Sequence, residues 1–182
     1  MLYVIAAPSG AGKTTIVKEI LKNNPELVFS ISATTRKKRA GEEDGKDYFY
    51  FSKEHFQDKI RNNELVEYEI LFNGEYYGTL KSFIEENLQK NKSMIFDVDV
   101  KGALAIKKLF REDARLIFIM PPDIETLKDR LRKRATEGPE QINERTKRVD
   151  LEIEKAKEFD YIVTNDHLEK ATSEVQRIIS SF

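Results

Sequence analysis

The sequence predicts an α/β fold, in which a parallel sheet carries helices on both faces. Short apolar runs, typical of buried parallel strands, occur at residues 2–6, 94–96, 116–120 and 161–163. Amphipathic stretches of helical periodicity alternate with these runs. A loop of small residues with two glycines directly follows the first run. Alternating strands and helices of this kind are typical of parallel strands joined by crossover helices.

The remaining elements are predicted by the same patterns. In the first half they are a helix ending at Asn23-Asn24-Pro25, strands at 29–32, 48–51 and 64–72, and helices at 52–62 and 80–89. In the second half they are helices at 103–110 and 168–182, a helix capped by Asp123, and a longer helix opened by Pro139. The stretch 34–72, with its polar loop at 34–46, breaks the alternation and predicts a small β-rich insertion.

Composition restricts the possible functions. The 182 residues suffice for one domain with a core, and the net charge of -1 provides no general attraction to nucleic acid or anionic membranes. The absence of cysteine excludes disulfides and thiolate metal sites. No apolar stretch is long enough to span a membrane, and Lys13 interrupts the first apolar run too early for a signal peptide. We therefore expect a cytoplasmic protein.

The loop that follows the first strand is the strongest local motif. Ala7-Pro8-Ser9-Gly10-Ala11-Gly12-Lys13-Thr14 fits a relaxed Walker A pattern, with Ala7 in place of the first glycine. Glycines let backbone N–H groups converge on phosphate oxygens, at the positive end of the following helix. Lys13 can then reach the β- and γ-phosphates, and the Thr14 hydroxyl can ligate Mg²⁺. A chance match is disfavoured, because a strand precedes the loop and a helix follows it.

Two acidic residues follow a second buried strand. Asp97 and Asp99 lie where that strand ends, and ligands of open α/β sheets bind at the carboxyl ends of strands. Carboxylates there suit a Mg²⁺–nucleotide, since Mg²⁺ takes hard oxygen ligands. The alternative for Asp99 is a purely structural role as the cap of the next helix.

Further motifs, in this order along the chain, resemble the guanylate kinase family. They are Pro8-Ser9-Gly10-Ala11-Gly12-Lys13-Thr14, Ser32-Ala33-Thr34-Thr35-Arg36, Arg39-Ala40-Gly41-Glu42, Gly45-Lys46-Asp47-Tyr48, Tyr76-Tyr77-Gly78-Thr79, Asp97-Val98-Asp99 with Gly102, and Leu127-Lys128-Asp129-Arg130-Leu131 followed by Arg134, Thr136-Glu137 and Arg145. The resemblance extends from residue 3 to about residue 168. Taken alone, the basic cluster at 36–39 would more often be a solvated face.

The resemblance implies a P-loop kinase fold and a reaction. It implies a single domain with a parallel-sheet core at 1–32, 80–123 and 153–182, a GMP-binding insertion at 33–79 and a helical lid at 124–152. The implied reaction converts ATP and GMP to ADP and GDP with Mg²⁺. GMP is then the small-molecule substrate, no nucleic acid or membrane partner is expected, and the oligomeric state stays open.

The resemblance also implies residue roles. The catalytic residues would be Lys13, Arg36, Arg130, Arg134 and Arg145. ATP would be bound by Ala7, Pro8, Ser9, Gly10, Ala11, Gly12, Lys13, Thr14, Thr15 and Asn165, and the metal by Thr14 and Asp97. The GMP phosphate would be held by Arg36, Arg39, Tyr48 and Tyr77, and guanine by Ser32, Glu67 and Thr79. Gly78, Asp97 and Asp99 complete the substrate site, the two aspartates lying between the nucleotides.

Three departures from the family pattern leave alternatives open. Ala6 and Ala7 replace Ser-Gly, and Lys101 replaces Gln. One extra residue between Glu67 and Tyr77 leaves Glu69 as an alternative guanine-binding carboxylate, because it shares a strand face with Glu67. Two other functions also remain: a P-loop kinase with a different acceptor, and a non-catalytic binding module, which the intact Gly12-Lys13-Thr14 disfavours.

Overall fold

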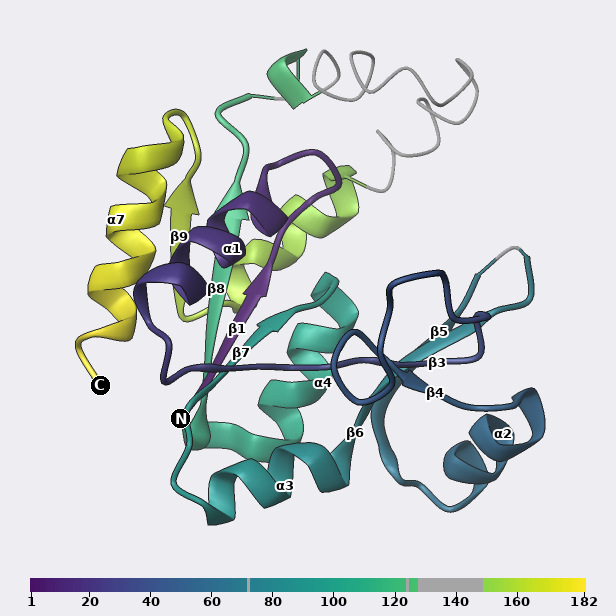
Figure 1. Ribbon diagram of the computed structural model, residues 1–182. Coiled ribbons are helices and arrows are strands. Elements are labelled where there is room, and N and C mark those ends of the chain that lie inside the picture. Colours follow the sequence, from purple (N-terminus) through teal and green to yellow (C-terminus); the bar gives the residue numbers. More distant parts are fainter. Residues whose placement is uncertain (72, 124, 128–148) are drawn as a thin grey trace.

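The computed structural model describes residues 1–71, 73–123, 125–127 and 149–182, which form two sheets and their helices (Figure 1). The larger sheet has five strands in the order β2-β7-β1-β8-β9, and every pair is parallel. Its strands are β1 (Leu2–Ala6), β2 (Val28–Phe29), β7 (Met94–Asp97), β8 (Ala114–Met120) and β9 (Tyr161–Thr164). The predicted parallel core is thereby confirmed.

Both faces of this sheet are buried. Tyr3 and Ile5 face α1 (Lys13–Asn23) and α7 (Leu168–Ile179), and the Tyr3 hydroxyl donates to the Ile179 carbonyl at 3.0 Å. The alternate strand residues face α3 (Lys81–Gln89), α4 (Val100–Phe110) and the short 3₁₀ helix η2 (Lys155–Glu158). A second short 3₁₀ helix, η1 (Arg111–Asp113), connects α4 to β8 and has no buried residue. Because neither face meets water, the strands are continuous apolar runs in the sequence.

The smaller sheet is built from one stretch of the chain. Its order is β4-β3-β6-β5, with strands β3 (Ala33–Thr34), β4 (Phe49–Tyr50), β5 (Leu65–Ile70) and β6 (Tyr76–Leu80). The helix α2 (Lys53–Arg61) packs Phe56 against it, and the Ser52 hydroxyl accepts from the His55 N–H at 3.2 Å, as the predicted cap requires. This sheet therefore has a core of its own beside the main one (Figure 1).

The structure differs from the predicted strands in two places. The strand expected at 29–32 ends at Phe29, because the chain leaves the larger sheet there and joins the smaller sheet as β3. The Ser30 N–H still donates to the Ile95 carbonyl of the larger sheet at 2.9 Å. Strand β6 was not predicted from periodicity, since Gly78 weakens the pattern, yet β6 is paired on both sides, with β3 and β5.

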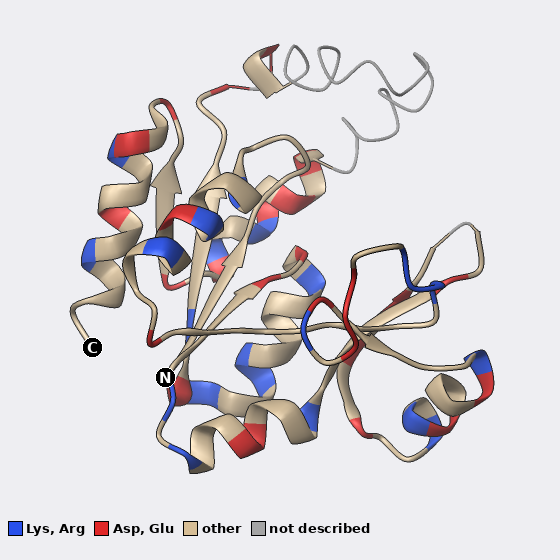
Figure 2. Cartoon of the chain, in the orientation of Figure 1, with Lys and Arg blue, Asp and Glu red and all other residues tan. Residues whose placement is uncertain are grey.

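The predicted lid at 124–152 lies mostly outside the described residues. At its start the Asp123 carboxylate accepts from the Thr126 N–H at 2.6 Å, the hydrogen bond expected of a helix cap. Within the described part of the chain, no helix combines the length and apolar character needed to cross a bilayer. Lys and Arg are interspersed with Asp and Glu over the helices of both sheets, in keeping with the balanced net charge (Figure 2).

Candidate active site

The loop between β1 and α1 has the geometry of an anion cradle. Gly10 and Gly12 have φ values of 92° and 90°, in the left-handed region that favours glycine. The loop closes on itself, with the Ala11 N–H donating to the Pro8 carbonyl at 3.1 Å. Gly12 is also the residue that precedes the first turn of α1, so the positive end of this helix faces the loop.

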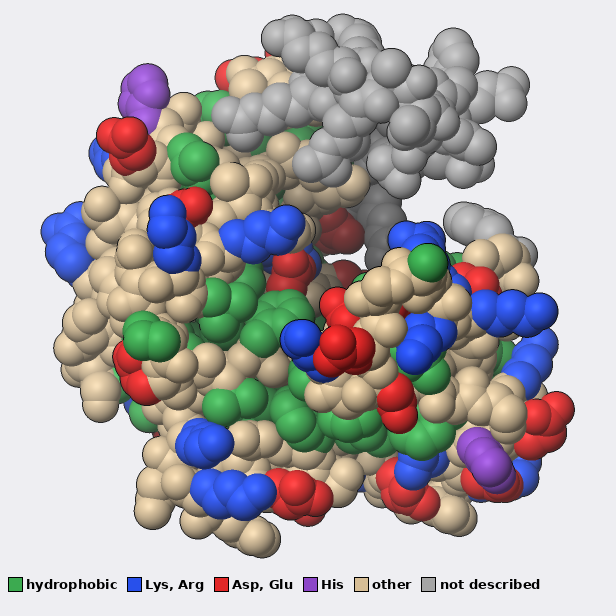
Figure 3. All heavy atoms as spheres, in the orientation of Figure 1, with side chains coloured by type: hydrophobic (Ala, Val, Ile, Leu, Met, Phe, Trp, Pro, Cys, Tyr) green, Lys and Arg blue, Asp and Glu red, His purple; other side chains and the backbone are tan. Residues whose placement is uncertain are grey.

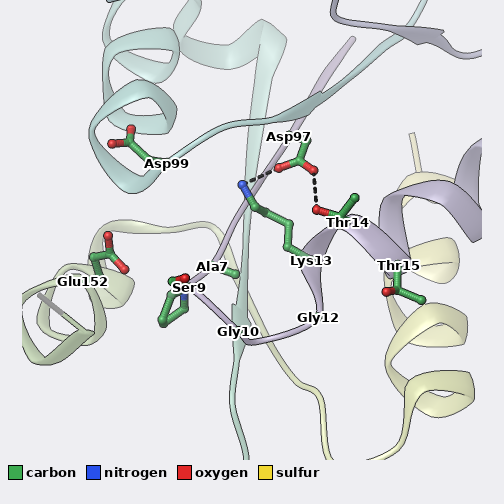
Figure 4. Close-up of a pocket in the computed structure, with 11 residues that line it drawn as sticks. Ala7, Ser9, Gly10, Gly12, Lys13, Thr14, Thr15, Asp97, Asp99 and Glu152 are labelled. Atoms are coloured by element: carbon green, nitrogen blue, oxygen red, sulfur yellow. Dashed lines mark hydrogen bonds and ion pairs between the residues drawn. The ribbon is translucent and has the colours of Figure 1, made fainter. Parts of the chain in front are cut away.

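A cleft of about 380 Å³ opens over this loop (Figure 4). Its lining comprises Ala7, Pro8, Ser9, Gly10, Gly12, Lys13, Thr14, Thr15, Asp97, Asp99 and Glu152. Ala11, predicted with the loop, is fully buried beneath it. Glu152 was missed by the sequence analysis, because it belongs to a distant segment that no motif connects to the loop. In the space-filling view, acidic side chains are visible in a hollow of the surface (Figure 3).

Asp97 organises the polar groups of the cleft. Its carboxylate forms an ion pair with the Lys13 ammonium group and accepts from the Thr14 hydroxyl at 3.1 Å. Lys13 also donates to the Val98 carbonyl at 2.6 Å, so the charge of Lys13 is held at the end of β7 (Figure 4). The side chains of Lys13 and Asp97 are both only 18% exposed. The Lys13 ammonium group is therefore restrained at the carboxyl end of β7, within the cleft that the phosphate loop lines.

The oxygens of Thr14 and Asp97 fit the chemistry of Mg²⁺. They are hard ligands that lie within hydrogen-bond distance of each other. Among the residues that the structure describes, no group of three or more Asp, Glu, His or Cys side chains is placed to hold a metal. A Mg²⁺ ion here would therefore complete its shell with phosphate oxygens and water, as is usual for Mg²⁺–nucleotide sites.

Asp99 does cap α4, since its carboxylate accepts from the Gly102 N–H at 2.8 Å. The structural alternative for this residue is therefore observed. It does not exclude a functional one, because Asp99 also lines the cleft.

A smaller cavity of about 130 Å³ adjoins the cleft. It is lined by Ser32, Glu67, Glu69, Tyr77, Gly78, Asp97, Val98 and Asp99. Asp97 and Asp99 line both cavities, so the acidic pair lies between them. The arrangement can hold two ligands, one on each side of this pair of carboxylates.

The register of β5 on β6 distinguishes the two candidate glutamates. Glu67 is opposite Thr79 and accepts from its hydroxyl at 2.6 Å, whereas Glu69 is opposite Tyr77 and is exposed. Burial raises the pKa of Glu67 above its ordinary value; the Thr79 hydrogen bond opposes this shift, and the charges of Asp99 and Glu69 add to it. A Cβ on Gly102 would lie 3.3 Å from Glu67 Cγ, so this glycine lets α4 approach Glu67 closely.

A third cluster, next to the small cavity, gathers around Arg36. Both terminal nitrogens of its guanidinium donate to Glu42, at 3.0 and 2.7 Å, and the Tyr48 ring centroid is 5.1 Å from its Cζ. The ring of Tyr48 is 6.1 Å from that of Tyr77, which lines the cavity. The Arg39 side chain is exposed, while its N–H donates to Glu42 at 2.7 Å.

The electrostatics of this cluster are coupled. The hydrogen bonds from Arg36, from the Arg39 N–H and from Tyr50 lower the pKa of Glu42 to about 2. Glu42 in turn raises the pKa of Arg36, and partial burial together with Glu42 raises the pKa of Tyr50 to about 12. Sequence reasoning assigned no role to Glu42 or Tyr50. Two signals in the sequence were available: Glu42 ends one of the quoted motifs, and Tyr50 lies two residues after Tyr48 in the strand predicted at 48–51.

Comparison with known proteins shows the family to which the chain belongs. The guanylate kinase family model matches residues 1–182. The chain belongs to the guanylate kinase family. The guanylate kinase of Bacteroides thetaiotaomicron is 44% identical over 181 residues, covering 100% of this chain and 89% of that protein. The guanylate kinase of Chlorobium chlorochromatii is 45% identical over 181 residues and is covered to 95%.

A solved structure agrees with the sequence relatives. The crystal structure of guanylate kinase from Anaplasma phagocytophilum superposes with a TM-score of 0.75 at 30% identity, covering 100% of this chain and 85% of that one. The resemblance found in the sequence is thus confirmed, and with it the P-loop kinase fold and the assignment of this guanylate kinase family member as an enzyme.

Asn165 lies against the phosphate loop itself. Its side-chain amide donates to the Ala11 carbonyl at 2.7 Å, and its Nδ2 is 2.5 Å from where a Cβ of Gly12 would be. The residue is 4% exposed and supports the loop from β9 and the segment that follows. Its predicted contact with ATP stays a prediction. Arg130, Arg134 and Arg145 lie outside the described residues, and their roles also stay predictions from the family resemblance.

Proposed function

We propose that this enzyme transfers the γ-phosphate of ATP to GMP across the acidic pair Asp97 and Asp99, giving ADP and GDP. The observation that supports it best is the adjoining pair of cavities. One cavity opens on the phosphate loop, the other contains the Glu67 carboxylate, and both are lined by the two aspartates. Family membership over the whole chain provides the reaction type.

The ATP side works by placement of charge. The loop N–H groups and the first turn of α1 bind the phosphates, and Lys13, held by Asp97, faces the oxygens on which negative charge develops. Thr14 and Asp97 would hold Mg²⁺, which neutralises phosphate charge when bound. No general base is required, because the acceptor is already a phosphate oxyanion. Catalysis then consists of in-line positioning and charge neutralisation.

The GMP side combines base recognition with a phosphate site. Glu67 accepts hydrogen bonds from guanine N1 and N2, with Thr79 orienting the carboxylate and Ser32 lining the same cavity. Adenine has an acceptor at N1, which would face the carboxylate unfavourably. Arg36, Arg39, Tyr48 and Tyr77 hold the GMP phosphate through charge-assisted and hydroxyl hydrogen bonds. Both nucleotides are cytoplasmic metabolites, and we propose that compartment for the enzyme.

A coupled assay of ADP release tests this function. ATP with GMP should give rapid turnover, and AMP should be poorer by about 10⁴-fold, the discrimination typical of a site built around hydrogen bonds that the wrong substrate lacks. Equal rates with AMP and GMP would refute the proposal and would favour a P-loop kinase with another acceptor. Absence of turnover with every nucleoside monophosphate would favour the non-catalytic module instead.

A further inference from the structure

Four hydrogen bonds converge on the carboxylate of Glu42. Arg36 provides two of them, from Nη1 to Oε2 at 3.0 Å and from Nη2 to Oε1 at 2.7 Å. The Arg39 N–H and the Tyr50 hydroxyl each donate to Oε2 at 2.7 Å. The Arg36 and Glu42 side chains are 10% and 19% exposed. Through these hydrogen bonds Glu42 connects three parts of the chain: Arg36 after β3, Arg39 in the same loop as Glu42, and Tyr50 in β4.

These contacts add side-chain links between β4 and a segment, described in full, that contains no helix or strand of its own. Residues 35–48 connect β3 to β4, and their backbone is held by turns, such as the Glu42 N–H donating to the Arg39 carbonyl at 3.2 Å, and by an isolated bridge between Asp44 and Tyr48. The Arg36 guanidinium packs on the Tyr48 ring at 5.1 Å and on the Tyr50 ring at 5.9 Å. Without the Glu42 carboxylate, the guanidinium would lose its bidentate partner and keep the Lys37 carbonyl, to which Nη1 donates at 2.8 Å, so its plane and the Tyr48 ring that packs on it would be less firmly fixed.

A carboxylate next to a phosphate site is unfavourable as a charge. It repels the dianion and offsets part of the positive charge of Arg36. Its effect on binding can be favourable only through geometry, because a guanidinium and a backbone held in place before binding lose less entropy on binding. Bidentate pairing with a carboxylate is an arrangement that fixes a guanidinium plane well.

We propose that Glu42 is a positioning residue for the GMP phosphate: it holds Arg36, the Arg39 backbone and Tyr50 in the arrangement that receives this group. The inference rests on the proposed function, since it takes the Arg36 cluster to be the phosphate site. Charge and geometry predict opposite outcomes for Glu42→Gln. If charge repulsion dominated, GMP would bind more tightly to the variant, whereas loss of positioning weakens GMP binding.

The test is steady-state kinetics on the full-length enzyme. Glu42→Gln keeps the side-chain size but turns one acceptor of the bidentate pair into a donor, so we expect KM for GMP to rise about ten-fold or more, with KM for ATP unchanged. Glu43→Gln is the matched control: Glu43 is the next residue, is 65% exposed and pairs with Lys46, and its replacement should leave both KM values unchanged.

Two further measurements separate positioning from general damage. By calorimetry, Glu42→Gln should weaken GMP binding but leave guanosine binding unchanged, because guanosine lacks the phosphate. In an Arg36→Ala background, Glu42→Gln should add little, since contacting residues in one network are not additive. An unchanged or lower KM for GMP, or equal losses for GMP and guanosine, would overturn the inference.

If the Glu42→Gln variant does not fold, Tyr50→Phe provides a second test, because it removes only the hydroxyl that donates to Glu42. A rise of KM for GMP by about two- to ten-fold would support the inference, since one hydrogen bond typically contributes that much, and an unchanged KM would overturn it. Failure of the wild-type enzyme to use GMP at all would instead refute the proposed function, so the two hypotheses are tested separately.

Discussion

Replacing Glu67 with glutamine tests how the enzyme selects guanine. The structure places one oxygen of Glu67 on the Thr79 hydroxyl at 2.6 Å, in the wall of the small cavity that Glu67 shares with Asp97 and Asp99. A carboxylate held in this way can accept from both N1–H and N2–H of guanine. Glu67→Gln keeps the shape of the side chain but removes its charge and turns one acceptor into a donor.

The size of the effect follows from the two hydrogen bonds. A hydrogen bond to a charged group contributes about 1.5–3 kcal/mol, so losing two would reduce kcat/KM for GMP by roughly 10²–10⁴. The amide oxygen can still accept one of the guanine protons, which favours the lower part of this range, about 10²–10³. Binding of ATP should be almost unchanged, because Glu67 does not line the ATP cleft.

The assay compares Glu67→Gln with Glu69→Gln in GMP titrations at saturating ATP. Glu69 is two residues along β5, is opposite Tyr77 and is exposed, so its replacement should change kcat/KM by less than about three-fold. A large loss in Glu69→Gln with normal kinetics in Glu67→Gln would show that the extra residue of this chain shifts the guanine-binding position. Normal kinetics in both variants would refute recognition by a carboxylate of β5.

Three further predictions concern acid pH and the phosphate loop. Because burial raises the pKa of Glu67, guanosine binding should weaken as pH falls through that raised pKa, at pH values where an ordinary glutamate is still ionised. Calorimetry should show that binding to the Glu67→Gln variant does not depend on pH in this range. The same pH profile in both proteins would contradict the assignment. Lys13→Ala should lower kcat by roughly 100-fold or more, the usual cost of a lost charge stabiliser, and near-normal turnover would refute the role of the loop. Gly12→Ala should destabilise the fold by about 1–2 kcal/mol from the positive φ alone, and a clash of the new Cβ with Asn165 should add to this loss. In denaturant unfolding, the double variant Gly12→Ala/Asn165→Ala should recover part of the lost stability. No recovery would mean that the clash is absent.

Much of the fold was predictable because its signals are local. The strands of the larger sheet are buried on both faces and are therefore apolar runs, and the phosphate loop needs its glycines and Lys13 at fixed spacing. The short strands of the smaller sheet were harder. β3 is only two residues long, like β2 at the edge of the larger sheet, and β6 is held by neighbours on both sides despite Gly78, so their pairing depends on contacts distant in sequence.

The sequence by itself determined the family, the phosphate loop and the acidic pair, since each depends on residue types at short, fixed separations. Only the tertiary structure distinguishes the surroundings of Glu67 and Glu69, which share one strand face and differ in the partner that the β5–β6 register places opposite them. It also revealed Asn165 beneath Gly12 and the convergence of Arg36, Arg39 and Tyr50 on Glu42. Such contacts join residues through the folding of loops and sheets, and no periodicity of the chain records them.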